Sequence, residues 1–248
     1  MAKSTKGYCK YCGKEYTRTG MLKHLKACKK KIGIYEKATK MEPYYELMLY
    51  GKYDHDYWLL IQIKDNATLD DLDQFIRDIW VECCGHLSAF YIEDKTYDKV
   101  PDVDFYWGEP SESMEHALKE VFDVGMNVGY EYDFGSTTEI TIKVLDHYKA
   151  PVQDKKIEIL SRNNPLHYQC SLCGVRPAAW IDPLKIYDED PFLCDECYTK
   201  FEEGEVDDTS GCDIEIMLPV TNSPRMGVCG YDGSRLYPEQ FEPDADIE

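Results

Sequence analysis

The sequence contains no long apolar run. No segment approaches the roughly 20 consecutive apolar residues that a membrane-spanning helix needs. Residues 1–30 also lack an apolar stretch of the kind found in secretory signal peptides. These absences argue against a membrane-spanning or signal-bearing protein. We therefore expect a cytoplasmic location and no membrane partner.

Positive charge is scarce beyond residue 40. The 248 residues include 28 Lys and Arg against 47 Asp and Glu, a formal net charge of −19. Residues 1–40 hold 12 of the basic residues and two acidic ones, so residues 41–248 hold 16 basic and 45 acidic residues. Because so acidic a region repels phosphate groups, any contact with nucleic acid is expected through residues 1–40. We expect a protein partner for the acidic remainder, and the oligomeric state is left open.

The chain lacks the even cysteine count of a disulfide framework. Its 11 cysteines include two sets with the spacing of metal ligands, each offering four nitrogen or sulfur donors. A tetrahedral zinc ion takes four such donors, and a closed shell leaves no position for a catalytic water. The sequence therefore predicts two structural Zn²⁺ ions per chain in a reducing compartment.

The first set has the pattern Cys9-x2-Cys12-x11-His24-x3-Cys28. A Cys-x2-Cys turn places two sulfurs at the right separation to share one ion, and the His and Cys four residues apart lie on one face of a helix. This pattern predicts a C2HC zinc finger over residues 1–31.

The finger helix is expected to run from about Met21 to Lys31, with Thr17 or Thr19 as its N-cap. Its face opposite the ligands would be strongly basic. A single finger covers only about three base pairs, so it could equally bind protein or stabilise a terminus. The residues predicted to contact nucleic acid are Lys23, Lys26, Lys29, Lys30 and Lys31.

The second set has the pattern Cys170-x2-Cys173-x20-Cys194-x2-Cys197. Two Cys-x2-Cys turns separated by a loop are typical of zinc ribbons and treble clefs. We therefore predict a four-cysteine zinc module over residues 165–204.

Four cysteines belong to neither set. Cys83 and Cys84 precede His86 by a few residues, which is compatible with a third metal site or with a thiol nucleophile. Cys83 also falls on the apolar stripe of a predicted helix, and this favours a small buried side chain. Cys212 and Cys229 could substitute in the second metal site, but their spacing favours free thiols. No third complete set is expected.

Residues 43–164 have the periodicity of a mixed α and β domain. Two aromatic and β-branched runs, 44–50 and 57–64, surround a turn and predict a hairpin. A helix is expected after Thr68, whose capping box includes Asp71. We predict an α+β fold, with a mixed β-sheet core and two helices flanked by the two zinc modules. The linker is expected at 32–42 and an acidic, turn-rich segment at 205–248.

The core contains motifs that resemble a known family. They are Trp58-Leu59-Leu60-Ile61-Gln62-Ile63, Thr68-Leu69-x2-Leu72, His86-Leu87-x2-Phe90 and Tyr130-Glu131-Tyr132-Asp133-Phe134-Gly135. In order and spacing, residues 43–160 resemble the plasmid pRiA-type open-reading-frame-three family, also labelled insertion-element passenger or TnpR-like. The resemblance implies an association with mobile elements, and the zinc modules lie outside it.

The chain departs from the family pattern after Gly135. The family usually continues with Asp and then with Trp and His at alternate positions, where this chain has Ser136, Thr138 and Ile140. This departure leaves His86 without an expected polar partner. The TnpR label also implies a recombinase, but the sequence shows no serine-recombinase nucleophile segment and no basic DNA-binding tail.

The sequence favours interaction over catalysis. Asp133 is a polar residue within an apolar motif, and strand alternation would turn it to solvent, opposite Phe134. We expect a zinc-binding adaptor that contacts nucleic acid, or a protein bound to nucleic acid, through its basic finger. The alternative is a hydrolase or nucleic-acid-processing enzyme of a mobile-element-associated family, with a site that the sequence does not reveal.

Overall fold

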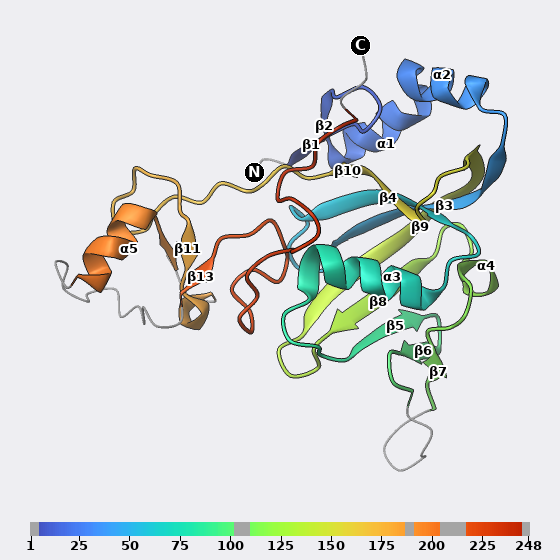
Figure 1. Ribbon diagram of the computed structural model, residues 1–248. Coiled ribbons are helices and arrows are strands. Elements are labelled where there is room, and N and C mark those ends of the chain that lie inside the picture. Colours follow the sequence, from blue (N-terminus) through green and yellow to red (C-terminus); the bar gives the residue numbers. More distant parts are fainter. Residues whose placement is uncertain (1–4, 102–109, 187–190, 204–216, 245–248) are drawn as a thin grey trace.

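The computed structural model describes residues 5–101, 110–186, 191–203 and 217–244. An eight-stranded sheet lies at the centre, in the order β10-β4-β3-β9-β8-β5-β6-β7 (Figure 1). Neighbouring strands are antiparallel except β6 and β7. The strands are β3 (Met41–Gly51), β4 (Trp58–Lys64), β5 (Ser88–Ile92), β6 (Lys95–Asp98), β7 (Glu112–Ser113), β8 (Asn127–Tyr132), β9 (Thr138–Pro151) and β10 (Ile157–Arg162).

The predicted α+β class and mixed sheet are confirmed, since one of the strand pairs is parallel. The predicted number of two helices is too low. The described residues contain five α-helices, of which α3 and α4 belong to the core. They are α1 (Arg18–Ala27), α2 (Lys29–Lys37), α3 (Leu69–Ile76), α4 (Leu118–Val121) and α5 (Asp195–Glu202). Within the described ranges, no helix combines the length and apolarity needed to cross a lipid bilayer.

Helix α3 begins as the sequence predicts. The Thr68 side chain accepts a hydrogen bond from the Asp71 amide at 3.1 Å, and the Asp71 carboxylate accepts one from the Thr68 amide at 2.9 Å. The helix then widens into a π-helical turn, Arg77–Val81, and the chain is extended at Glu82. The helix therefore stops short of Cys83, which lies in the following turn rather than on its apolar stripe.

Strand β4 is buried on both faces of the sheet. Leu59 and Ile61 belong to the cluster beneath α3, whereas Trp58 and Leu60 pack against the N-terminal finger. A strand covered on both sides carries apolar residues at consecutive positions, which explains the uninterrupted run from Trp58 to Ile61. The finger and α3 accordingly lie on opposite faces of the sheet (Figure 1).

Residues 32–42 do not form the expected linker. They include the second half of α2 and the beginning of β3. The Tyr35 ring packs against the finger cluster, and its hydroxyl donates to Gln62 Oε1 on β4 at 3.3 Å. This contact fastens α2 to the sheet, so the finger continues into the core without a free spacer.

The C-terminal module and the chain beyond it return to the core. A small sheet consists of β11 (Trp180–Ile181), β12 (Phe192–Leu193) and β13 (Leu218–Pro219). After β13 the chain crosses the core and ends beside the finger, where Asp244 pairs with Lys10 at 2.9 Å (Figure 1). Residues 205–216 and 245–248 of the expected acidic segment lie outside the described residues.

Candidate metal centres

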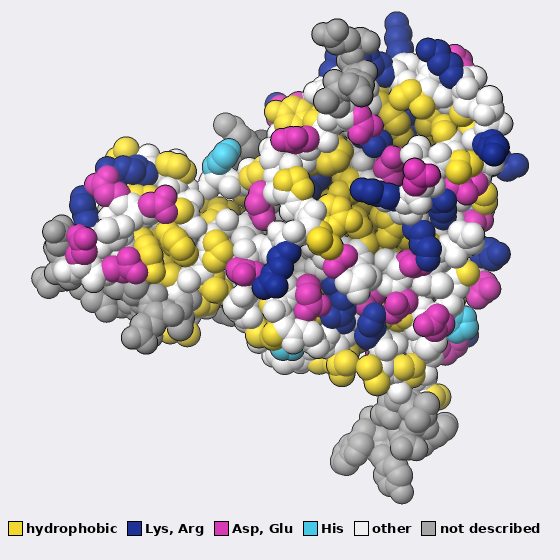
Figure 2. Space-filling model, in the orientation of Figure 1, with side chains coloured by type: hydrophobic (Ala, Val, Ile, Leu, Met, Phe, Trp, Pro, Cys, Tyr) yellow, Lys and Arg dark blue, Asp and Glu magenta, His cyan; other side chains and the backbone are white. Residues whose placement is uncertain are grey.

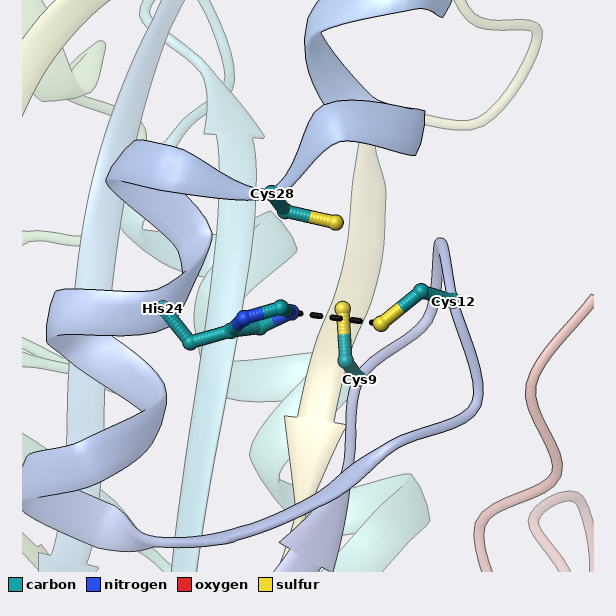
Figure 3. Close-up of side chains that lie close together, drawn as sticks. All are labelled: Cys9, Cys12, His24 and Cys28. Atoms are coloured by element: carbon teal, nitrogen blue, oxygen red, sulfur yellow. Dashed lines mark hydrogen bonds between the residues drawn. The ribbon is translucent and has the colours of Figure 1, made fainter.

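The first predicted ligand set converges in the finger. A hairpin of β1 (Lys6–Tyr8) and β2 (Glu15–Thr17) carries Cys9 and Cys12, while His24 lies on α1 and Cys28 follows it. Their four ligand atoms lie within 4.8 Å of one another, and Cys12 Sγ is 3.2 Å from His24 Nε2 (Figure 3). The structure thus offers three thiols and one imidazole to a single ion.

Local contacts position these ligands. Gly13 closes the cysteine turn at φ 66°, and its amide donates to the Cys9 carbonyl at 2.9 Å. The Tyr16 ring stacks on the His24 imidazole with centroids 4.1 Å apart, which fixes the plane of the imidazole. Burial lowers the pKa of His24 and so favours the neutral form that binds metal.

The predicted single finger helix is divided at Cys28. Thr17, one of the two predicted caps, accepts a hydrogen bond from the Gly20 amide, and α1 ends at Ala27. Cys28 has extended backbone and is the N-cap of α2, which begins at Lys29. The break turns the Cys28 thiol toward the other three ligands, and it also separates the five predicted lysines between two helices.

The lysines of the predicted interface are not equivalent. Lys23, Lys26 and Lys29 are exposed on α1 and at the start of α2, and Lys30 is half-buried. Lys31 is enclosed by the rings of Tyr11, Tyr35 and Tyr148, with its Nζ 5.9, 5.2 and 5.2 Å from their centroids. The structure thus turns Lys31 inward, away from the exposed basic face on which the sequence placed it.

The second predicted set also converges. Cys170, Cys173, Cys194 and Cys197 place their sulfurs within 4.8 Å of one another, and three of the four residues are buried. Cys173 Sγ and Cys194 Sγ are 4.0 Å apart. This separation is close to the S···S distance of about 3.8 Å expected from two Zn–S bonds of about 2.3 Å at a tetrahedral angle.

Backbone amides stabilise the Cys173 thiolate. Hydrogen bonds from the amides of Arg176 and Val175 lower the pKa of Cys173 to about 6. The neighbouring Cys197 is more enclosed, and burial raises its pKa. Because thiols bind metal in their deprotonated form, binding of an ion at this set would be coupled to proton release.

A third group of potential ligands lies at the edge of the core, where the sequence predicted none. Cys83, Cys84 and His86 follow α3, and Cys229 approaches from the C-terminal segment. Cys229 is a free cysteine, as expected, but its Sγ lies 3.2 Å from His86 Nε2. His86 and Cys229 are 143 residues apart, so no local spacing connects them. The Cys83-Cys84-x-His86 pattern was the one signal in the sequence that pointed to a metal site here. Cys212 lies outside the described residues.

Asp133 does not face solvent as predicted. Strand β8 ends at Tyr132, and Asp133 adopts a left-handed conformation with φ 65° that turns its side chain inward. Its carboxylate accepts a hydrogen bond from Arg225 Nη2 at 2.7 Å and lies 3.4 Å from His86 Nε2. Burial alone would raise the pKa of Asp133, but hydrogen bonds, chiefly from Arg225, outweigh it and lower the pKa. His86 therefore has polar neighbours that the sequence did not predict.

The sequence also did not predict a buried polar network between α3 and the sheet. Asp73 is fully buried on α3 and accepts hydrogen bonds from Arg77 Nε at 2.8 Å, Ser88 Oγ at 2.6 Å and the Tyr130 hydroxyl at 2.8 Å. Each carboxylate oxygen therefore has a donor. This network joins α3 to β5 and β8.

Comparison with known proteins finds a similarity confined to the core. Residues 50–163 match the family model described as "Plasmid pRiA4b ORF-3-like protein". A solved chain described as "Protein of Unknown Function MM3350 from Methanosarcina mazei Go1" is similar, with 20% identity, a TM-score of 0.42, and 50% of this chain and 70% of that chain covered. A search of curated proteins found no match.

The matched residues begin at the end of β3 and continue to the end of β10. They contain Cys83, Cys84 and His86. The finger ligands, the four cysteines of the C-terminal module and Cys229 lie outside the matched segment. Over residues 50–163 the chain is similar to the plasmid pRiA4b ORF-3-like family, and most candidate metal ligands lie outside that similarity.

Proposed function

We propose that the protein is a zinc-binding adaptor that contacts nucleic acid through residues 1–40 and a protein partner through its acidic remainder. The observation that carries this proposal is the convergence of two complete four-donor sets, one before and one after the acidic core in the sequence. Each set would hold one Zn²⁺ ion, through Cys9, Cys12, His24 and Cys28 or through Cys170, Cys173, Cys194 and Cys197.

The donor sets support a structural role for the metal. Thiolates and imidazole are the ligands that zinc prefers in structural sites, and four protein donors complete the shell. The finger ligands are surrounded by Met21, Leu25 and Trp58 in a common apolar cluster. Metal there would stabilise the packing of the finger on the sheet.

The charge distribution supports the finger as the nucleic-acid contact. Lys23, Lys26 and Lys29 are exposed, and basic side chains gather at the end of the molecule that α1 and α2 form (Figure 2). Three lysine–phosphate contacts on duplex DNA would give a slope of log K against log salt of about −2.7. Such binding would be weakly sequence-specific, because phosphate contacts position a protein without reading bases.

The surroundings of Asp133 favour an adaptor over the hydrolase alternative. A general base needs a carboxylate that is free to take a proton. The Asp133 carboxylate is instead paired with the buried Arg225, and amides of Gly135 and Ser136 donate to it at 3.0 and 3.2 Å. These contacts hold it in its ionised form as a structural group.

The test is binding of the full chain to duplex DNA and to single-stranded RNA over a range of salt concentrations. The full chain is needed because the finger shares its apolar cluster with β4 and β10. We expect Lys23→Glu with Lys26→Glu to weaken binding at least tenfold. Lys119→Glu with Lys155→Glu is the matched control, since both lysines are exposed outside the finger, and it should change affinity less than the finger variant. Absence of binding at low salt would contradict the nucleic-acid contact.

A further inference from the structure

We infer that Cys83, Cys84, His86 and Cys229 form a third zinc site, which ties the C-terminal segment to the core. All four ligand atoms lie within 4.8 Å of one another, as in the two predicted sets. Three sulfurs and one imidazole nitrogen are the same donors that the finger offers. This inference stands apart from the adaptor proposal, because the two predicted sets share no residue with it.

The distances within the group fit a shared ion. Cys83 Sγ and Cys84 Sγ are 3.7 Å apart, near the value of about 3.8 Å for two thiolates on one tetrahedral zinc. His86 Nε2 lies 3.0 Å from Cys84 Sγ and 3.2 Å from Cys229 Sγ. The corresponding S···N distance around zinc is about 3.6 Å, so an ion would require only small movements of exposed side chains.

The turn that carries three of the ligands is held by hydrogen bonds. Glu82 Oε1 accepts from the Gly85 amide at 2.6 Å and from the Tyr132 hydroxyl at 3.1 Å. The Tyr132 hydroxyl in turn accepts from the His86 amide at 3.3 Å. Gly85 adopts φ 82°, a conformation that allows the chain to reverse between Cys84 and His86. These contacts direct the thiols and the imidazole toward one point.

The fourth ligand is positioned by buried anchors in the C-terminal segment. Ser223 Oγ donates to the Trp80 carbonyl at 2.5 Å, and the fully buried Arg225 donates to Asp133 at 2.7 Å. Arg225 Nη2 also lies 3.5 Å from Cys83 Sγ. The same arginine therefore anchors the segment that carries Cys229 and contacts Cys83, a second member of the group.

The backbone at Cys229 is consistent with this role. Cys229 adopts φ 49°, between Gly227 at φ 76° and Gly230 at φ 70°. A residue with a Cβ atom is disfavoured in this conformation. Here it accompanies an approach of the Cys229 thiol to within 3.2 Å of His86 Nε2.

The third site differs from the first two in exposure. Cys84 and Cys229 are exposed, whereas the finger and module sets each have at least two buried cysteines. A chelator reaches exposed ligands more readily. We therefore expect the third ion to be released first when the folded protein is treated with a chelator.

Metal analysis of the reduced full chain tests the inference. Zinc per chain should be near three in the wild type and near two in Cys229→Ser and in Cys84→Ser. Cys212→Ser is the matched cysteine control and should keep three. A wild-type value of two, unchanged in Cys229→Ser, would overturn the third site while leaving the two predicted sets intact.

Two further measurements decide the question if a variant fails to fold. Titration of metal-free wild type with Co²⁺ should continue to a third equivalent, with growth of the thiolate-to-cobalt absorption and of the tetrahedral visible bands. Saturation at two equivalents would contradict the site. Thiol titration of the unfolded, unreduced wild type should give the 11 thiols of the sequence. A value of nine would indicate a disulfide in place of the metal.

Discussion

Arg225 and Asp133, 92 residues apart in sequence, form a buried ion pair with a distance of 2.7 Å between Nη2 and Oδ2. The pair fastens the C-terminal segment to the end of β8. Arg225 also donates to Thr138 Oγ1 at 2.9 Å and to the Ser136 carbonyl at 3.1 Å. Its guanidinium lies 4.8 Å from the centre of the Tyr132 ring. One arginine therefore contacts the carboxylate, hydroxyl, carbonyl and ring of four different core residues.

Replacement of this arginine should be strongly destabilising. Arg225→Met would leave the Asp133 carboxylate buried without its cation, a change that typically costs about 3–5 kcal/mol. Urea unfolding followed by far-UV circular dichroism measures the loss. Arg235→Met is the matched control, because Arg235 is exposed, and it should change the free energy of unfolding by less than about 0.5 kcal/mol. Equal stability of both variants would contradict the importance of the pair.

The same ion pair should make the free energy of unfolding depend on pH. The pKa of Asp133 is lower in the folded protein than in the unfolded chain, because Arg225 favours the ionised carboxylate. The ionised Asp133 carboxylate therefore contributes its full stabilisation above the pKa of about 3.9 that it has in the unfolded chain. This stabilisation is lost as the pH falls through the lower pKa of the folded protein. We expect the difference in stability between wild type and Asp133→Asn to shrink from pH 6 toward pH 2. A constant difference over this range would contradict the assignment.

Loss of one module ligand should unfold the module and spare the core. Structural zinc contributes about 10–16 kcal/mol in small metal-dependent modules, and the apolar cluster around Cys170 is small. Limited proteolysis of Cys173→Ser should cleave within residues 165–203 and leave a resistant core. Val175→Ala, just after the ligand turn, is the control because its side chain is exposed, and it should be digested like wild type. Complete degradation of Cys173→Ser would show that the core depends on the module.

Lys31 should affect stability more than nucleic-acid binding. Its Nζ lies among three tyrosine rings and 4.0 Å from Glu46 Oε2. Lys31→Met should lower the free energy of unfolding by about 1–2 kcal/mol through loss of cation–π contacts. In the same binding assay it should retain affinity, whereas Lys26→Glu should not. A binding defect of Lys31→Met with unchanged stability would restore the original expectation that Lys31 contacts phosphate.

The finger should depend on a close approach between Gly7 and β10. A Cβ atom at Gly7 would lie 2.0 Å from the Arg162 carbonyl oxygen. Overpacking of this kind costs about 1–3 kcal/mol, so Gly7→Ala should loosen the finger and increase hydrogen exchange of α1 amides. Gly33→Ala is the control, since nothing lies within 4 Å of its added Cβ, and it should stabilise α2 by about 0.5–1 kcal/mol. Unchanged exchange in Gly7→Ala would argue that the finger packs elsewhere.

Features that depend on near neighbours in the chain could be predicted from the sequence. The capping box of Thr68 and Asp71, the antiparallel hairpin of β3 and β4, and the convergence of each predicted ligand set follow from short spacings. A cysteine turn limits its two sulfurs to nearby positions whatever the rest of the fold does. The similarity of the core to the plasmid pRiA4b ORF-3-like family was visible for the same reason, because the shared motifs are contiguous segments.

Other features were decided only by tertiary packing. The fold brings Cys229 to His86 and Arg225 to Asp133 across 143 and 92 residues, a juxtaposition that no local pattern encodes. The left-handed turn at Asp133 overrides the strand alternation that would have exposed its carboxylate. Lys31 is turned inward because the chain breaks at Cys28 to complete the ligand set. Spacing in the sequence determined which donors could share an ion locally, and the path of the C-terminal segment over the core decided which distant groups meet.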